Sequence, residues 1–135
     1  MMENTFPEAE AKVSSTNTPW IVEITAGDHQ WTIDEPLEDG GGNTAHNPYE
    51  SLLAALGSCT NITVQMYAQR KQWALQGVEV RLQLFREGNS TRIVRDLSLS
   101  GELDQAQRER LLAVANGCPV HRVLTQPLHI ETQLT

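Results

Sequence analysis

Two cysteines are the residues of this chain best suited to chemistry. Cys118 stands in the sequence Cys118-Pro-Val-His121, and Cys59 lies within a long run of apolar residues at helical spacing. In disulfide-cycling and peroxide-reducing proteins, one thiol is oxidised and a second thiol from another segment condenses with it. If the two sulfurs meet in the fold, we expect this chemistry here.

Cys118 occupies a position that favours a thiolate, which is the reactive form of a cysteine. It precedes Pro119, a good first residue of a helix, and the free N–H groups of a helix start stabilise an anion. His121 lies three residues on, at the spacing of side chains that share a helix face, and is a candidate base or cation. A purely structural role is the alternative for both residues.

Cys59 stands in a less favourable setting. Residues 1–59 contain ten acidic residues and a single cation, Lys12, and burial raises the pKa of a thiol. A structural core cysteine is therefore the alternative to a reactive one. A reactive Cys59 needs a cation from Arg95, Arg122, a histidine or a second subunit.

Arg95 is a candidate because of its place in an expected strand. Strict alternation puts it on the same face as Ile93 and Leu97, where an unpaired guanidinium is costly. We expect either a bulge that turns Arg95 outward or a partner inside, an acid or a thiolate.

Alternating and helical apolar patterns divide the rest of the chain. Residues 1–18 are polar without a sustained period and predict a loosely held tail, followed by a single domain over residues 19–135, and the glycine-rich residues 39–43 predict a flexible loop. The expected elements are strands over 20–25 and 31–33, a helix over 48–73, strands over 78–85 and 93–99, a helix from the Asp104 cap to Asn116, a helix over 119–124 and a strand over 128–134. This order, β-β-α-β-β-α-α-β, predicts an α+β domain with a mainly antiparallel sheet.

Composition excludes several classes of partner. The formal net charge of −7 argues against binding to nucleic acid or to an anionic membrane surface. No apolar run reaches the ~18 residues of a membrane span, and the start of the chain lacks a secretory pattern, so we expect a cytoplasmic protein. Two cysteines do not make a disulfide scaffold, and no cofactor is expected.

Longer stretches of the sequence resemble a known superfamily. The matching segments are Asn47-Pro48-Tyr49-Glu50-Ser51-Leu52-Leu53-Ala54-Ala55-Leu56-Gly57-Ser58-Cys59-Thr60, Met66-Tyr67-Ala68, Lys71-Gln72-Trp73, Gly77-Val78-Glu79-Val80, and Leu111-Leu112 through Cys118-Pro119-Val120-His121-Arg122. They resemble the OsmC and organic hydroperoxide resistance (Ohr) superfamily, in particular its small OsmC-like redox proteins. The resemblance implies an intertwined homodimer in which sheets wrap two long central helices and active sites lie at the subunit interface.

The resemblance also implies roles for individual residues. Cys59 matches the thiol that attacks a hydroperoxide and becomes a sulfenic acid, and Cys118 matches the thiol that then forms a disulfide with it, which a dithiol reduces. Glu50 is the nearest match to the carboxylate that orients the family's activating arginine, although it stands one residue late. That arginine comes from the early strands of the family, but the first arginine here is Arg70, so Arg95 is the candidate substitute.

Two other kinds of function fit the same residues. One is a noncatalytic OsmC-like dimer that binds a small apolar ligand in a groove lined by Leu52, Leu56 and tryptophans, with both thiols inert. The other is a metal site. Its candidate ligands are His29, His46, Cys59, Cys118 and His121.

Overall fold

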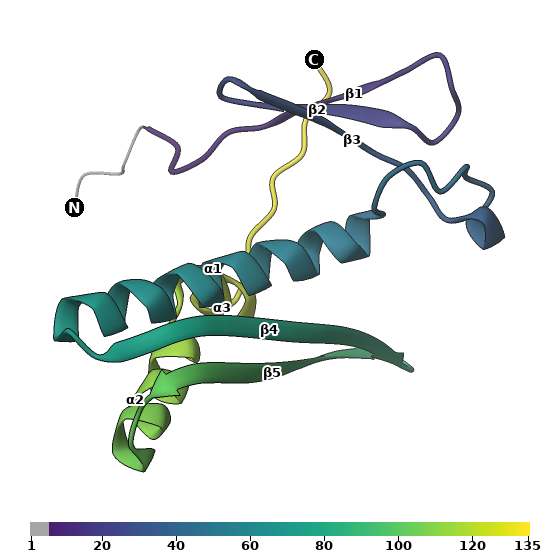
Figure 1. Ribbon diagram of the computed structural model, residues 1–135. Coiled ribbons are helices and arrows are strands. Elements are labelled where there is room, and N and C mark those ends of the chain that lie inside the picture. The colour runs from purple at the N-terminus through teal and green to yellow at the C-terminus, as the bar shows by residue number, and fades with distance from the viewer. Residues whose placement is uncertain (1–5) are drawn as a thin grey trace. The chain divides into compact units, whose positions relative to one another are not determined.

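The computed structural model describes residues 6–135 and contains two compact units, one ending at Ser51 and one comprising Leu52–Thr135 (Figure 1). All strand pairs in both units are antiparallel, so the fold is α+β, as the sequence predicted. The expectation of a single domain over residues 19–135 stays a prediction. Within residues 6–135, no helix is both long enough and apolar enough to cross a membrane.

The first unit contains a three-stranded sheet in the order β1-β2-β3. Strand β2 (Val22–Ala26) pairs with β3 (His29–Ile33) through a turn at Gly27, whose φ of 59° lies in the left-handed region that glycine tolerates. This hairpin confirms the sequence prediction. Strand β1 (Lys12–Ser15) adds to β2, so the expectation of an irregular tail up to residue 18 is wrong for these residues. Residues 12–15 are ordered because their backbone hydrogen-bonds with β2, which their polar side chains did not indicate.

A buried carboxylate organises the glycine-rich loop. Asp34 is fully buried and accepts hydrogen bonds from the N–H groups of Glu35, Gly42 and Thr44 and from the Thr44 hydroxyl, at 2.7, 3.2, 3.0 and 2.7 Å. The Thr44 hydroxyl and its N–H hold the pKa of Asp34 below the usual range, against the effect of burial. The loop expected to be flexible is therefore held by defined hydrogen bonds, together with the short helix η1 (Leu37–Asp39).

Helix α1 (Pro48–Lys71) begins with reciprocal capping. The side chain of Asn47 accepts from Glu50 N at 2.8 Å, and the Glu50 carboxylate accepts from Asn47 N at 3.0 Å. This arrangement satisfies two N–H groups at the helix start. The helix ends at Lys71 because Gln72 turns into the left-handed region, with φ 59°.

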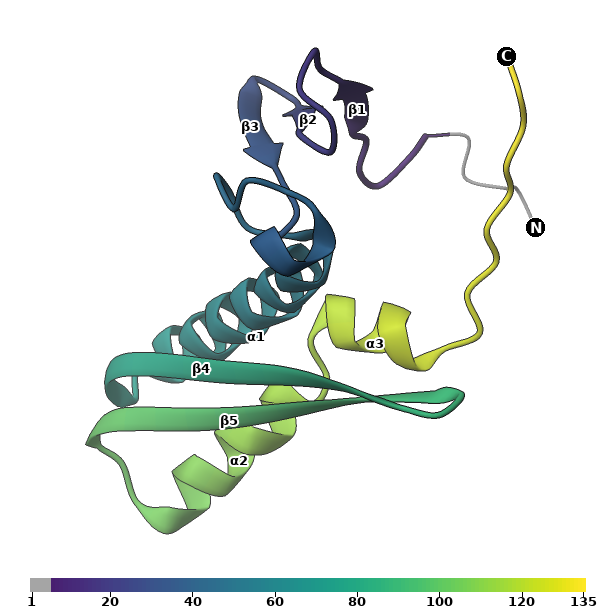
Figure 2. The ribbon, with the colours of Figure 1, turned by 90° about the vertical axis from the view of Figure 1, so that its right-hand side faces the viewer.

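The second unit is built on a long ribbon of β4 (Ala74–Glu87) and β5 (Ser90–Glu102). Its core joins α1 to α2 (Gln105–Ala115) through Val64, Ala68, Leu111 and Ala115, all buried. Alternate residues of both strands pack against this cluster, which places the two helices on one face of the ribbon. Figure 2 shows the ribbon twisting along its length. The sequence predicted this second hairpin and both helices.

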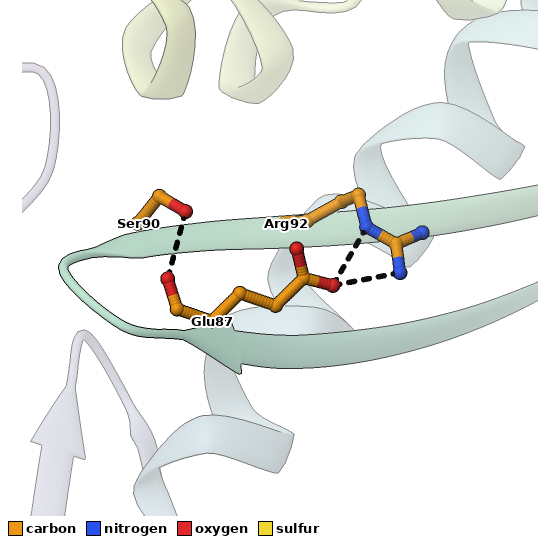
Figure 3. A network of polar contacts seen from close by, with 3 residues as sticks. All are labelled: Glu87, Ser90 and Arg92. Atoms are coloured by element: carbon orange, nitrogen blue, oxygen red, sulfur yellow. Dashed lines mark hydrogen bonds and ion pairs between the residues drawn. The ribbon is translucent and has the colours of Figure 1, made fainter.

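The free end of the ribbon is closed by exposed polar contacts (Figure 3). Arg92 Nε and Nη2 donate to Glu87 Oε1 at 3.3 and 2.9 Å, and Ser90 Oγ donates to the Glu87 carbonyl at 3.0 Å. Because both charged side chains are more than half exposed, this ion pair contributes at most about 1 kcal/mol to stability.

Gly57 lets the ribbon approach α1 closely. A Cβ atom on Gly57 would lie 2.7 Å from Leu82 Cδ1, so the absence of a side chain there makes room for the leucine. Leu82 pairs across the ribbon with Arg95, so the contact between Gly57 and Leu82 fixes the position of Arg95 along the axis of α1.

Two helices follow the ribbon, and both have the predicted caps. Asp104 and Gln107 form a capping box at α2, and Cys118 caps α3 (Pro119–Thr125). The strand expected over residues 128–134 is absent. These residues pair with no strand of the described chain, and Leu128, Ile130 and Leu134 are 63, 77 and 101% exposed.

The contact between Gly57 and Leu82 generates a stability prediction. Gly57→Ala should lower the free energy of unfolding in urea by about 1 kcal/mol at matched protein concentration, because displacement of Leu82 outweighs the better helix propensity of alanine. In a Leu82→Ala background the same change should raise it by about 1 kcal/mol, since the methyl group then has room. Stabilisation by Gly57→Ala in the unaltered chain would contradict this packing.

Candidate thiol redox site

The start of α3 brings the two cysteines together. Val120 N donates to Cys59 Sγ at 3.5 Å, and His121 N donates to Cys118 Sγ at 3.4 Å. The first N–H groups of a helix have no partner within the helix, so here two consecutive ones are satisfied by two sulfurs. Sequence analysis placed Cys118 at this helix start, and the family resemblance implied that Cys59 meets it, but the N–H of Val120 was not predicted as a partner of Cys59.

The Cys59 thiol is one of the groups that lower the pKa of Cys118. Both cysteines are free thiols. Cys118 is fully buried, whereas Cys59 on α1 is partly exposed. The pair therefore consists of one partly exposed residue and one buried residue.

Arg95 supplies the positive charge of this site. The register of β4 and β5 is regular at Arg95, so the expected bulge is absent and its side chain stays on the inner face. It donates to Thr60 Oγ1 at 2.9 Å and to Asn116 Oδ1 at 2.9 Å, and its Nη2 lies 3.0 Å from His121 Nδ1. Its partners are neutral oxygen and nitrogen atoms rather than the expected acid or thiolate. Within Leu52–Thr135, no carboxylate pairs with this guanidinium.

Thr60 connects the arginine to the sulfur. This buried hydroxyl donates to the Leu56 carbonyl at 2.7 Å, accepts from Arg95, and lies 3.7 Å from Cys118 Sγ. Because a hydroxyl has one hydrogen and two lone pairs, the second lone pair is available to accept from the Cys118 thiol. The Thr60 hydroxyl oxygen is therefore the single atom that links the Arg95 guanidinium to the Cys118 sulfur.

The pKa of Cys118 lies below the ordinary value for a thiol. Burial is the largest single influence and acts to raise it, but it is outweighed by the N–H of His121, the Thr60 hydroxyl, the Cys59 thiol and the charge of Arg95 acting together. The site stabilises negative charge on sulfur.

His121 contributes a neutral ring. Burial first, and the charge of Arg95 second, lower the pKa of His121. With Nδ1 facing the guanidinium, the neutral ring accepts there and carries its hydrogen on Nε2. This arrangement does not support the expectation that His121 is a cation, and it leaves the backbone N–H of His121 as its contribution to the sulfur.

Two polar residues of the site were missed by sequence analysis. Thr60 follows Cys59 directly, and its polar side chain at a buried position of α1 was the signal that could have identified it. Asn116 was recognised only as part of a helix end, which is its local role. Glu50, by contrast, was expected to orient an arginine, and in its own unit its carboxylate caps α1; its role beside an arginine stays a prediction.

A cavity of ≈ 420 Å³ lies against this network, lined by Leu56, Ile93, Arg95, Asn116, His121, Leu124 and Thr125. We call it the Arg95 pocket. It combines apolar walls with a cationic and hydrogen-bonding end, which is typical of sites for small amphipathic molecules. Leu56, expected in an apolar groove, lines it, and Leu52 does not.

Among residues 6–135, no group of three or more histidine, cysteine, aspartate or glutamate side chains is arranged to hold a metal ion. Cys59, Cys118 and His121 do converge, but the lone pair of the His121 ring faces Arg95 rather than the sulfurs. The alternative of a metal site at these residues finds no support in this geometry.

Known proteins share this fold. OsmC-like protein of Mycoplasma pneumoniae has a TM-score of 0.74 at 17% identity over 87% of each chain. The organic hydroperoxide resistance protein OsmC of Legionella pneumophila has a TM-score of 0.64 at 20% identity, covering 91% of this chain and 92% of that one. Organic hydroperoxide resistance protein OhrB of Bacillus subtilis has a TM-score of 0.61 at 18% identity, covering 89% and 92%.

Sequence comparison gives the family. No curated protein matches the sequence. The family model described as OsmC-like protein matches residues 40–133, a stretch that contains the cysteines, Thr60, Arg95 and His121. The chain belongs to the OsmC-like protein family, within the OsmC and Ohr superfamily that the sequence motifs indicated.

Proposed function

We propose that this protein reduces organic hydroperoxides with its two thiols. The observation that carries the proposal is the convergence of both sulfurs on consecutive N–H groups of α3, with Cys118 linked to Arg95 through Thr60. Hydroperoxide resistance is named for structural neighbours with the same fold. The family and the local chemistry thus support the same reaction class.

The proposed reaction has two steps. The Cys59 thiolate attacks one oxygen of the hydroperoxide, the O–O bond breaks, Cys59 becomes a sulfenic acid, and the alkoxide takes a proton to leave as an alcohol. The Cys118 thiolate then attacks the Cys59 sulfur and displaces hydroxide, which leaves as water. Cys59 is assigned the first step because it is the partly exposed residue of the pair, and Cys118 the second because it is buried.

The Arg95 pocket supports an organic rather than an inorganic peroxide. Its apolar residues Leu56, Ile93 and Leu124 provide surface for an alkyl group, and Arg95 provides donors for oxygen. Three N–H hydrogens of the guanidinium are engaged by Thr60, Asn116 and His121, which leaves two for a ligand. Thiol–disulfide exchange, with one dithiol or with two monothiols, then reduces the disulfide in the thiol-rich environment of a cytoplasm.

A homodimer is part of the proposal. The C-terminal residues 126–135 expose Leu128, Ile130 and Leu134 along an extended segment that finds no strand partner in the described chain. Alternating apolar residues in an unpaired segment favour pairing with a second chain. We therefore expect size-exclusion chromatography with light scattering to give twice the chain mass, and Leu128→Lys/Ile130→Lys to shift it to the monomer; a wild-type monomer would contradict this prediction.

The noncatalytic alternative uses the same pocket. Its apolar walls and cationic end would also hold a small amphipathic molecule while the thiols stay reduced. Native mass spectrometry of the freshly purified protein separates the two functions, because a co-purified ligand with thiols that resist hydroperoxide favours binding alone.

Cysteine variants test the order of the steps. Cumene hydroperoxide should convert the wild type to a Cys59–Cys118 disulfide, and Cys118→Ser should accumulate a Cys59 sulfenic acid that dimedone traps. Cys59→Ser should lower the rate of hydroperoxide consumption by more than about a hundredfold, since it removes the nucleophile. Peptide mass spectrometry locates the adduct. Sustained turnover by Cys59→Ser, with the adduct on Cys118, would reverse the assignment.

Arg95 variants test the source of the stabilising charge. Arg95→Gln should raise the pKa of Cys118, so the ultraviolet absorbance of its thiolate should appear only at higher pH than in the wild type. Peroxide-dependent disulfide formation at neutral pH should slow by roughly tenfold. Arg92→Gln is the matched control, because it removes the same charge from the exposed end of the ribbon. Equal titrations for the two variants would remove Arg95 from the mechanism.

A further inference from the structure

A second cavity is lined by the chain neighbours of Cys118, Gly117 and Pro119, and its charge is unusual for this acidic protein. Its volume is ≈ 490 Å³, and three arginines, Arg70, Arg110 and Arg122, line it together with Tyr67 and apolar residues that include Met66 and Val114. We call it the arginine pocket. No aspartate or glutamate lines it, although the chain as a whole has a formal net charge of −7.

The three arginines lack negative partners. Within Leu52–Thr135, none of them forms an ion pair, and they come from three different helices, α1, α2 and α3. Like charges on separate helices repel one another unless an anion lies between them. Convergence of unpaired guanidinium groups on one cavity is therefore the arrangement that binds carboxylates, sulfonates or phosphates.

Tyr67 adds a hydrogen-bond donor to this pocket. Its oxygen accepts from Arg110 Nε at 2.8 Å, and its own O–H has no acceptor within Leu52–Thr135. The ring lies 5.3 Å from the Arg110 guanidinium and 5.7 Å from Lys71 Nζ. The hydrogen bond from Arg110, and then the charges of Arg110, Lys71 and Arg70, lower the pKa of Tyr67, against the effect of burial. The positive charges around the pocket thus stabilise the ionised form of Tyr67.

The arginine pocket borders the redox site on a different side from the Arg95 pocket. Gly117 and Pro119, the two neighbours of Cys118 in the chain, line it, and so does Thr63, one helical turn after Cys59. The Arg95 pocket is instead lined by Asn116 and His121. The two thiols therefore have one neighbouring cavity with apolar walls and another that is rich in arginine.

We propose that the arginine pocket binds the anionic group of a small thiol that reduces the Cys59–Cys118 disulfide. This inference rests on the proposed function, because it concerns the regeneration of the same site. A reductant held there by its charge approaches the sulfurs from a cavity other than the one proposed for the organic hydroperoxide. The protein then separates its two substrates by charge, with the anionic one directed to the cavity that three arginines line.

The reaction balances with two molecules of a monothiol. The first thiolate attacks one sulfur of the disulfide, forming a mixed disulfide and releasing the other cysteine as a thiolate. A second thiolate attacks the sulfur of the bound small molecule, which leaves as a symmetrical disulfide, and the remaining cysteine is released. Two electrons pass from the small thiols to the protein, and two protons from solvent complete the cysteine thiols.

The test compares two small thiols that differ in charge. The disulfide is prepared with diamide, so that its formation does not depend on peroxide chemistry, and is reduced with either 2-mercaptoethanesulfonate or 2-mercaptoethanol, with rates expressed per thiolate. In the wild type at low ionic strength, the sulfonate should react about tenfold faster. Added salt should reduce this ratio, because it screens the attraction.

Arginine variants locate the effect. Arg70→Gln/Arg122→Gln should bring the ratio of the two rates to about one or below, since the net negative charge of the protein then repels the sulfonate. Both rates depend on the reactivity of the disulfide, so a change in that reactivity cancels in their ratio. Arg92→Gln, at the exposed end of the ribbon, should leave the ratio unchanged. Circular dichroism and the rate with 2-mercaptoethanol establish that the variants are folded.

The outcomes separate this inference from the proposed function. A wild-type ratio at or below one, or a ratio that Arg70→Gln/Arg122→Gln leaves intact, overturns the arginine pocket as a reductant site. Failure of diamide to produce the disulfide also overturns it, because no disulfide then exists for the pocket to serve. A disulfide that forms with diamide but not with hydroperoxide, and that retains the charge preference, supports the reductant pocket and removes the peroxidase function alone.

Discussion

The guanidinium of Arg95 is the group to which the rest of the site is adapted. It lies on the inner face of a two-stranded ribbon that otherwise presents leucine, isoleucine and valine, where an unsatisfied charge is costly. Its hydrogen bonds to Thr60, Asn116 and His121 tie β5 to α1, to the end of α2 and to α3. A single side chain thereby fixes the positions of the three elements that carry or flank the cysteines.

Stabilisation of a thiolate in this site is shared among weak contributions. At Cys118, the backbone N–H of His121, the Thr60 hydroxyl, the other thiol and the Arg95 guanidinium act together against burial. Each contribution of this kind is modest, which is why their convergence on one helix start matters. The neutral state of His121 follows from the same charge, since a second cation beside Arg95 is disfavoured.

Much of this organisation could be predicted from local sequence, because it depends on caps and periodicity. The hairpins, the Asp104 capping box, the long helix and the Cys118 cap all follow from short-range patterns. Contacts between distant segments could not be predicted in the same way. Alternation placed Arg95 inward but did not identify Thr60 as its partner, and polar residues 12–15 form a strand only because β2 offers an edge. Residues 128–134 show the reverse case, an alternating sequence without a partner in the described chain.

The Thr60 hydroxyl has one hydrogen, which it gives to the carbonyl of Leu56. That arrangement suits a protonated Cys118, which can donate to the oxygen. Once the sulfur is ionised, two acceptors face each other across 3.7 Å, and the hydroxyl must rotate to donate to the sulfur instead. Ionisation of the buried Cys118 sulfur therefore changes the side-chain torsion of Thr60. Each time Cys118 loses its proton, the Leu56 carbonyl in α1 loses its hydrogen bond from the Thr60 hydroxyl.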